Sequence, residues 1–100
     1  MYARIVQVPI QPGTATEASA FFRDSVGPAL KQQAGFLNSR FLVNDETNQC
    51  LMVTLWESAD ARTGAETNGF LQDVLQRMKP YFAGPPTVDY YEVAVQVTNA

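Results

Sequence analysis

Short apolar runs bounded by turn-forming residues predict four β-strands in this chain. Each run is rich in β-branched or aromatic residues, and clusters of Gly, Pro, Asn or Asp separate the runs. The predicted strands span residues 2–10, 36–43, 49–57 and 87–97. The five polar residues 44–48 tolerate tight bends, so we expect the second and third strands to form a hairpin.

Between the first two strands, apolar residues recur at helical spacing and predict a helix over residues 14–33. Thr14 and Glu17 have the spacing of a capping box at its start. Pro28 follows Gly27 inside this helix and lacks a backbone N–H, so we expect a kink or break there. Gly35 stands where a left-handed residue would end the helix. The apolar positions are Ala18, Phe21, Phe22, Val26 and Leu30.

A second helical region precedes the last strand. Ser58 is a good N-cap for a helix from Ala59 to about Thr67, and Asn68-Gly69 interrupts it. A further helical segment then runs until Pro80 stops it. Its apolar face consists of Phe70, Leu71, Val74, Leu75 and Met78.

The element order β-α-β-β-α-β predicts an α+β, ferredoxin-like fold with a four-stranded antiparallel sheet and two helices on one face. Alternation predicts that the strands are apolar on both faces. One predicted face holds Ala3, Ile5, Leu37, Phe41, Val43, Leu51, Val53, Leu55, Tyr91, Val93 and Val95. The other holds Val6, Val8, Ile10, Phe36, Leu42, Met52 and Trp56. A second apolar face needs a cover, so we expect a homodimer formed by sheet-to-sheet packing.

The 100 residues, of which 46% are hydrophobic and 17% charged, suit one folded domain over residues 1–100. The net charge is −3 and the basic residues are scattered, which argues against binding to nucleic acids or anionic membranes. The chain shows neither a signal peptide nor an apolar run long enough to cross a bilayer. We therefore expect a cytoplasmic protein.

Cys50 is the single cysteine, and the chain has no histidine. These counts exclude an intrachain disulfide, zinc sites built from Cys and His, haem held by a proximal His, the Ser-His-Asp triad and a Cys-His pair. Cys50 lies in an apolar strand without a cationic neighbour in the sequence, so we interpret it as a core residue rather than a redox thiol.

Several short motifs resemble those of the antibiotic biosynthesis monooxygenase family, whose members are dimeric α/β-barrel proteins. They are MYAR at the start, PG before the first helix, GF at the second strand, D-x-T-N in the hairpin turn and TLWES at residues 54–58. The similarity spans essentially the whole chain. It implies a dimeric α/β barrel, and the family includes cofactor-independent monooxygenases of polyketide quinone precursors, haem-degrading oxygenases and small proteins without a known role.

The resemblance argues against haem degradation. The haem-degrading branch has an asparagine in the first strand, a tryptophan before the second helix and a haem-ligating histidine on that helix. Trp56 matches the tryptophan, but the asparagine position falls at or near Val6 and the histidine position near Val74. We therefore expect no haem and no other cofactor.

In members of the family that bind ligands, the cavity lies between the sheet and the helices. The resemblance points Trp56 into that cavity, and strand alternation then puts Tyr2, Arg4, Val6, Asn38, Arg40 and Thr54 on the same face. The opposite wall would come from the helices. Its candidate residues are Phe21, Phe22, Phe70, Val74 and Met78.

Each candidate has a plainer interpretation. Trp56 could stack on an aromatic ligand or could fill the core. Arg4 or Arg40 could stabilise a phenolate or enolate, or could pair with an acid or reach solvent. Two functions therefore stay open: a cofactor-independent monooxygenase of an aromatic or polyketide-like substrate, and a non-catalytic dimeric module that binds a small ligand or a partner.

Overall fold

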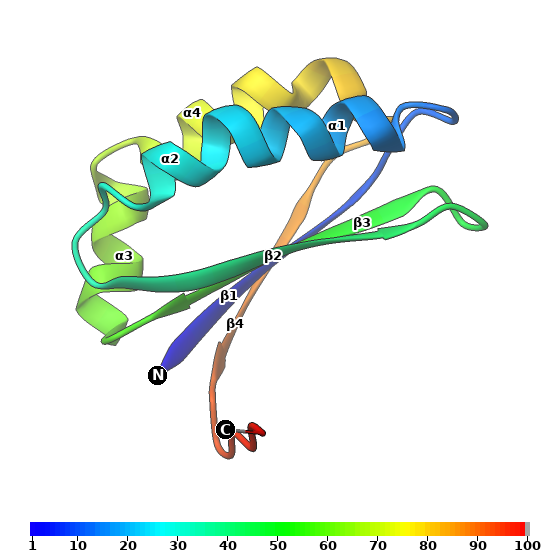
Figure 1. Ribbon diagram of the computed structural model, residues 1–100. Helices are drawn as coiled ribbons and strands as arrows, with labels where there is room; N and C mark the ends of the chain where they lie inside the picture. The colour runs from blue at the N-terminus through cyan, green and yellow to red at the C-terminus, as the bar shows by residue number, and fades with distance from the viewer. Residues whose placement is uncertain (100) are drawn as a thin grey trace.

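The computed structural model describes residues 1–99 and contains the predicted strands and helices in the predicted order (Figure 1). The strands are β1 (Tyr2–Pro9), β2 (Phe36–Asn44), β3 (Gln49–Trp56) and β4 (Thr87–Glu92). The helical segments are α1 (Ala15–Phe21), η1 (Phe22–Val26), α2 (Gly27–Leu30), α3 (Ala59–Thr67), α4 (Phe70–Met78) and η2 (Lys79–Tyr81).

The strands form one antiparallel sheet in the order β2-β3-β1-β4, which confirms the predicted ferredoxin-like α+β fold. Helices α1, α2 and α4 lie across one face of this sheet, and α3 stands at one end of it (Figure 1). The opposite face carries no other part of the described chain (Figure 1). The sheet therefore has a covered face and a bare face.

The core lies between the helices and the covered face. Alternate residues of the two central strands point into it, as the period of two requires. Arg4, Val6 and Val8 come from β1, and Cys50 to Trp56 alternate in the same way along β3. The helices contribute Ala18, Phe22, Val26, Leu30, Ala65, Leu71, Val74 and Met78.

The first helix continues past Pro28, but its regular α-helical geometry is interrupted just before this residue, as the prediction of a disturbed helix required. The segment η1 just before it is a π-helical turn, in which the Gly27 N–H donates to the carbonyl of Phe22, five residues back. Pro28 has no N–H to donate, and the wide turn accommodates that loss inside the helix. The helix is thus continuous to Leu30, and the turn carries the buried side chains of Phe22 and Val26.

A β-bulge in β2 corrects the predicted faces of that strand. Phe36 is opposite Trp56, but Asn38 is already opposite Leu55, so one extra residue enters the strand. Such an insertion exchanges the two faces for every later residue. Phe41 and Val43 consequently pack against the core, whereas Leu42 lies on the bare face and is 45% exposed.

The last strand was predicted to run to Val97, but it ends at Glu92. Glu92 pairs with Tyr2, and the Val93 N–H donates to the Met1 carbonyl at 2.9 Å. Strand β1 begins at Tyr2, and within residues 1–99 no strand pairs with the apolar alternation beyond Val93. Val95 and Val97 are 79% and 88% exposed.

The predicted helix caps are correct in part. Ser58 caps α3, with its Oγ accepting the Ala61 N–H at 3.0 Å. The Thr14 hydroxyl instead donates to the Gln11 carbonyl at 2.6 Å, so the predicted capping box does not form. Gly35 has a φ of 76°, and a Cβ at this position would overlap the Ala61 side chain, so the turn into β2 requires glycine.

Candidate functional site

A small cavity lies between the helices and the covered face of the sheet. It measures about 20 Å³, which is room for about one water molecule. Strands β1 and β3 form one wall, and η1, α2 and α4 form the other. The lining residues are Arg4, Val6, Phe22, Val26, Leu30, Met52, Thr54, Phe70, Leu71 and Val74.

Six of the twelve candidate pocket residues named from the sequence line this cavity: Arg4, Val6, Phe22, Thr54, Phe70 and Val74. Phe22 stacks on Phe41 at 5.0 Å between ring centroids, which fixes it on the wall formed by the first helix. Met78 is fully buried but packs in the core away from the cavity lining. Phe22 and Val26 belong to the π-helical turn, a geometry that is frequent at functional sites.

Trp56 also lies in the core rather than on the cavity wall, in agreement with the packing alternative. Its side chain is fully buried, and its Nε1–H donates to Thr54 Oγ1 at 3.0 Å. The ring meets Phe36 edge-on, with centroids 5.6 Å apart. The indole therefore fills the end of the sheet and has its polar atom satisfied.

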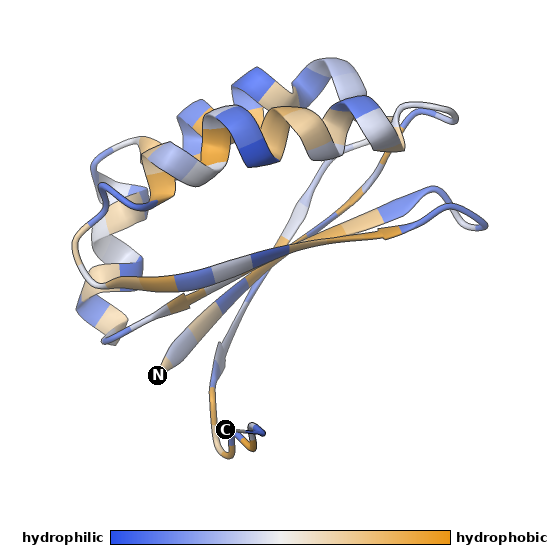
Figure 2. Cartoon of the chain, in the orientation of Figure 1, coloured by the Kyte–Doolittle hydropathy of each residue, from blue (hydrophilic) through white to orange (hydrophobic). Residues whose placement is uncertain are grey.

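Arg40 lies on the bare face of the sheet and does not line the cavity, which corrects its prediction as a pocket residue. It is opposite Val53, and its Nη1 donates to the Asn38 side chain at 3.3 Å. The cause is the β-bulge between Phe36 and Asn38, which reverses the expected alternation in the polar middle of β2 (Figure 2). Asn38 is misplaced in the prediction for the same reason.

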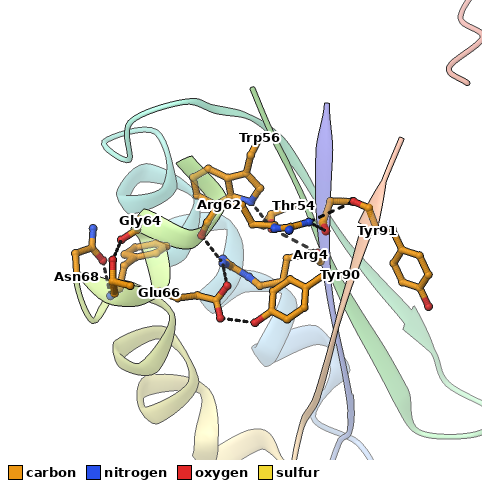
Figure 3. A network of polar contacts seen from close by, with 12 residues as sticks. Arg4, Thr54, Trp56, Arg62, Gly64, Glu66, Asn68, Tyr90 and Tyr91 are labelled. Atoms are coloured by element: carbon orange, nitrogen blue, oxygen red, sulfur yellow. Dashed lines mark hydrogen bonds and ion pairs between the residues drawn. The ribbon is translucent and has the colours of Figure 1, made fainter. Parts of the chain in front are cut away.

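Arg4 is the one charged side chain among the residues that line the cavity, and it is only 2% exposed. Its Nη1 donates to the Arg62 carbonyl at 3.4 Å and to Glu66 Oε2 at 3.5 Å (Figure 3). The guanidinium carbon lies 5.4 Å from the centroid of the Trp56 ring. Burial lowers the pKa of Arg4, and the carboxylate of Glu66 opposes that shift.

Glu66 and Tyr90 complete a polar network that the sequence interpretation missed (Figure 3). The Tyr90 hydroxyl donates to Glu66 Oε1, and this bond raises the pKa of Tyr90. Arg62 lies over the Tyr90 ring at 4.8 Å and donates to the Ala3 carbonyl at 3.2 Å. Arg62 and Glu66 are four residues apart on α3 and so share a helix face, a spacing that could have indicated this cluster.

A wider hollow of about 610 Å³ lies outside the core, between α4 and residues 82–86. Leu75 and Phe82 line it together with exposed polar side chains such as Gln72 and Lys79. No buried polar group is among its lining residues. The small cavity, which has a buried cation in its lining, is therefore the better candidate for a specific ligand site.

Residues 1–99 contain neither a cluster of metal-ligating side chains nor a helix that could span a membrane. No group of three or more His, Cys, Asp or Glu side chains is placed to hold a metal ion in this part of the chain. Over the same residues, none of the helices has the length and apolar character needed to cross a membrane.

Cys50 is fully enclosed in β3, and desolvation raises the pKa of its thiol to about 11. An unfolded thiol ionises near pH 8.5. The folded state therefore holds its proton more tightly, and this contribution to stability is lost as pH rises from about 8.5 towards 11.

Between about pH 7.5 and pH 10, we expect the free energy of unfolding of the wild type to fall by about 1–2 kcal/mol more than that of Cys50→Ala, as measured by urea unfolding. Parallel curves for the two proteins would contradict this prediction.

The chain is similar to proteins of one known family. A model of the antibiotic biosynthesis monooxygenase family matches residues 1–69. Uncharacterized protein Rv2557 of Mycobacterium tuberculosis is 28% identical over 94 residues, which make up 94% of this chain and 41% of that protein. The chain thus spans about two-fifths of the length of the curated relatives it matches.

Two solved structures are similar over nearly the whole chain. The monooxygenase from the gene ActVA-Orf6 of Streptomyces coelicolor, in complex with nanaomycin D, has a TM-score of 0.75 at 17% identity, covering 99% of this chain and 92% of that one. A mutant of MhuD with two manganese protoporphyrin IX molecules per active site has a TM-score of 0.78 at 24% identity, covering 99% and 100%. At these identities the similarity establishes the shared fold.

Proposed function

The chain belongs to the antibiotic biosynthesis monooxygenase family, and on that premise we propose that it is a cofactor-independent monooxygenase of an aromatic or polyketide-like substrate. The observation that carries the proposal is the small, mostly apolar cavity with the buried side chain of Arg4 among its lining residues. An apolar site with one well-placed charge suits a ring system that carries an anionic oxygen.

The reaction that fits this site uses the substrate's own electrons. A hydroxyanthrone loses a proton to give a delocalised anion, and this anion reduces O₂. The ring CH₂ becomes a carbonyl, with one oxygen atom entering the product and the other leaving as water. Arg4 would stabilise the anion, and the apolar walls would exclude water from it. No residue in the cavity lining is an acid or a histidine, so the substrate would bind as an anion that solvent has already deprotonated.

We expect oxygen uptake with hydroxyanthrones, and we expect Arg4→Gln to lower its rate about a hundredfold, the usual effect of removing one donor to a developing anion. An oxygen electrode gives the rate, and the quinone absorbance confirms the product. Arg40→Gln is the matched control, because Arg40 is exposed on the bare face and should leave the rate unchanged. Equal rates for wild type and Arg4→Gln would contradict the proposed role of Arg4.

A non-catalytic ligand-binding module is the second candidate. It is favoured by Thr54, whose hydroxyl is the neutral polar group of the lining. This hydroxyl already accepts the Trp56 N–H and donates to the Arg4 carbonyl at 3.5 Å, so its proton is directed to the protein rather than to a substrate. A thermal-shift titration separates the two functions. A hydroxyanthrone that raises the melting temperature without consuming oxygen would support binding alone.

We further propose that the protein is a homodimer in which the bare faces of two sheets pack together. Apolar side chains from all four strands lie on this face: Ile5, Leu42, Leu51, Val53, Leu55 and Tyr91. Leu42 and Tyr91 are among the exposed large hydrophobic residues. A contiguous apolar patch of this kind is unusual on a monomer, and a second copy would bury it.

A further inference from the structure

The guanidinium of Arg4 is only weakly satisfied by its protein partners. Both of its hydrogen bonds come from Nη1, and their lengths of 3.4 and 3.5 Å lie beyond the usual range for charged pairs. Within residues 1–99, Nε and Nη2 make no hydrogen bond to a protein atom. Arg4 is one of the residues that line the cavity, so these two nitrogens keep donor capacity for an acceptor that reaches its side chain there.

Glu66 contacts Arg4 but is not among the residues that line the cavity, and its side chain reaches solvent. One oxygen, Oε2, faces Arg4, and the other accepts the Tyr90 hydroxyl. The Glu66 side chain is 22% exposed and Tyr90 is 48% exposed. Glu66 can thus move away from Arg4 while it stays bonded to Tyr90 and hydrated.

We propose that Glu66 is a displaceable counter-ion of Arg4, which an aromatic ligand with an anionic oxygen replaces when it enters the cavity. The location of the ligand rests on the proposed function. The selectivity for an anion rests on the Arg4–Glu66–Tyr90 network. Glu66 would keep the empty site neutral, and the ligand anion would take over its electrostatic role.

This arrangement selects the charged form of a ligand. Separating a buried ion pair is costly unless another charge replaces the departing one. An aromatic carboxylate or phenolate supplies that charge, whereas a neutral ring of the same size leaves Arg4 paired to Glu66. Discrimination arises because the neutral ligand gains nothing from the exchange. The released carboxylate keeps the Tyr90 hydroxyl as a partner, which lowers the cost of the exchange.

The test compares 2-naphthoate with 2-naphthamide, two flat probes of similar shape that differ in charge, by titration calorimetry. Glu66→Gln removes the competing charge and should tighten 2-naphthoate binding about tenfold, a difference that corresponds to about 1.4 kcal/mol. Binding of 2-naphthamide should stay within about twofold, since it does not compete with Glu66. Glu92→Gln is the matched control: Glu92 is an exposed acid of β4 that makes no contact with Arg4. It should change neither affinity.

Tyr90→Phe provides a second variant that does not disturb the core, because Tyr90 is half exposed. It removes the hydroxyl that would stay bonded to Glu66 after its release from Arg4, so release becomes more costly and we expect 2-naphthoate to bind about threefold more weakly. Glu66→Gln should therefore tighten 2-naphthoate binding, whereas Tyr90→Phe should weaken it. A folding defect in Glu66→Gln would leave this second measurement decisive.

The outcomes separate this inference from the proposed function. If Glu66→Gln leaves 2-naphthoate binding unchanged while 2-naphthamide binds, the counter-ion role is wrong and the cavity still takes aromatic ligands. An equal gain for both probes would mean that Glu66 only obstructs the site, and an equal gain in Glu92→Gln would mean a general charge effect. Either result overturns the inference. If wild type and variants bind neither probe, the inference and the proposed ligand cavity are both wrong.

Discussion

Replacing Trp56 with alanine is expected to lower the free energy of unfolding by about 3–5 kcal/mol, the usual cost of truncating a large buried aromatic residue. The indole is fully buried, contacts Phe36 edge-on and lies 5.4 Å from the Arg4 guanidinium. Its loss leaves a cavity and removes the hydrogen bond to Thr54. A domain of this size has about 5–15 kcal/mol of stability in total, so the variant should be close to unfolding.

Trp56 is the only tryptophan, so urea unfolding of this variant must be followed by far-UV circular dichroism rather than by tryptophan fluorescence. Trp56→Phe is the matched control, because it retains most of the apolar area and should cost less than half as much. All proteins are compared at one concentration, since dimerisation would add to the apparent stability. A loss below about 1 kcal/mol in Trp56→Ala would show that the core does not depend on the indole.

Leu51→Lys is expected to convert the proposed dimer into a monomer at micromolar concentration. Leu51 lies on the central strand β3 within the bare face, between Leu42 of β2 and Gln7 of β1. A twofold interface would contain the new lysine twice, and each ammonium group would be buried without a partner. Light scattering coupled to size exclusion gives the mass of each species directly.

Gln72→Lys adds the same charge on the exposed side of α4 and should leave the mass unchanged. A dimer that persists in Leu51→Lys would place the interface elsewhere. A monomeric wild type would mean that the bare face has no second copy as its cover. Comparison of the melting temperatures of the two variants shows whether any change in mass comes from unfolding instead.

Much of the fold could be predicted because local signals and tertiary packing agree. The helical spacing of Phe70 to Met78 and the Asn68-Gly69 interruption appear in the structure as α4 and the left-handed Gly69 before it. Ser58 acts as the predicted cap. These features depend on neighbours within one helical turn, which a single sequence displays directly.

The errors arise where a strand depends on a distant partner. Nothing in residues 36–44 signals that an extra residue enters opposite Trp56, because a bulge is defined by pairing with another strand. Arg40 and Leu42 were therefore assigned to the wrong faces. The alternation of residues 93–97 likewise predicts a strand, but β1 starts too late to pair with it. Pro28 correctly indicated a disturbed helix, and the disturbance takes the form of a π-helical turn within a continuous helix.

The candidate site could be predicted in part for the same reason. Arg4 and Val6 on β1 and Phe22, Phe70 and Val74 on the helices were found from periodicity and family resemblance together. Glu66 was missed because its importance comes from Arg4, 62 positions away in the sequence. A charged residue on a helix is usually solvated, and only the register that sets Tyr90 opposite Arg4 brings the three side chains together.

The small volume of the cavity between the helices and the sheet has a kinetic consequence. A polycyclic ligand occupies far more than about 20 Å³, so it can enter only after the helical wall has moved away from the sheet. That movement is a first-order step of the protein alone. The observed association rate would therefore level off at high ligand concentration, at the frequency with which the wall opens. The π-helical turn holds Phe22 and Val26 in this wall, so we expect the stability of its backbone to influence the rate at which the wall opens.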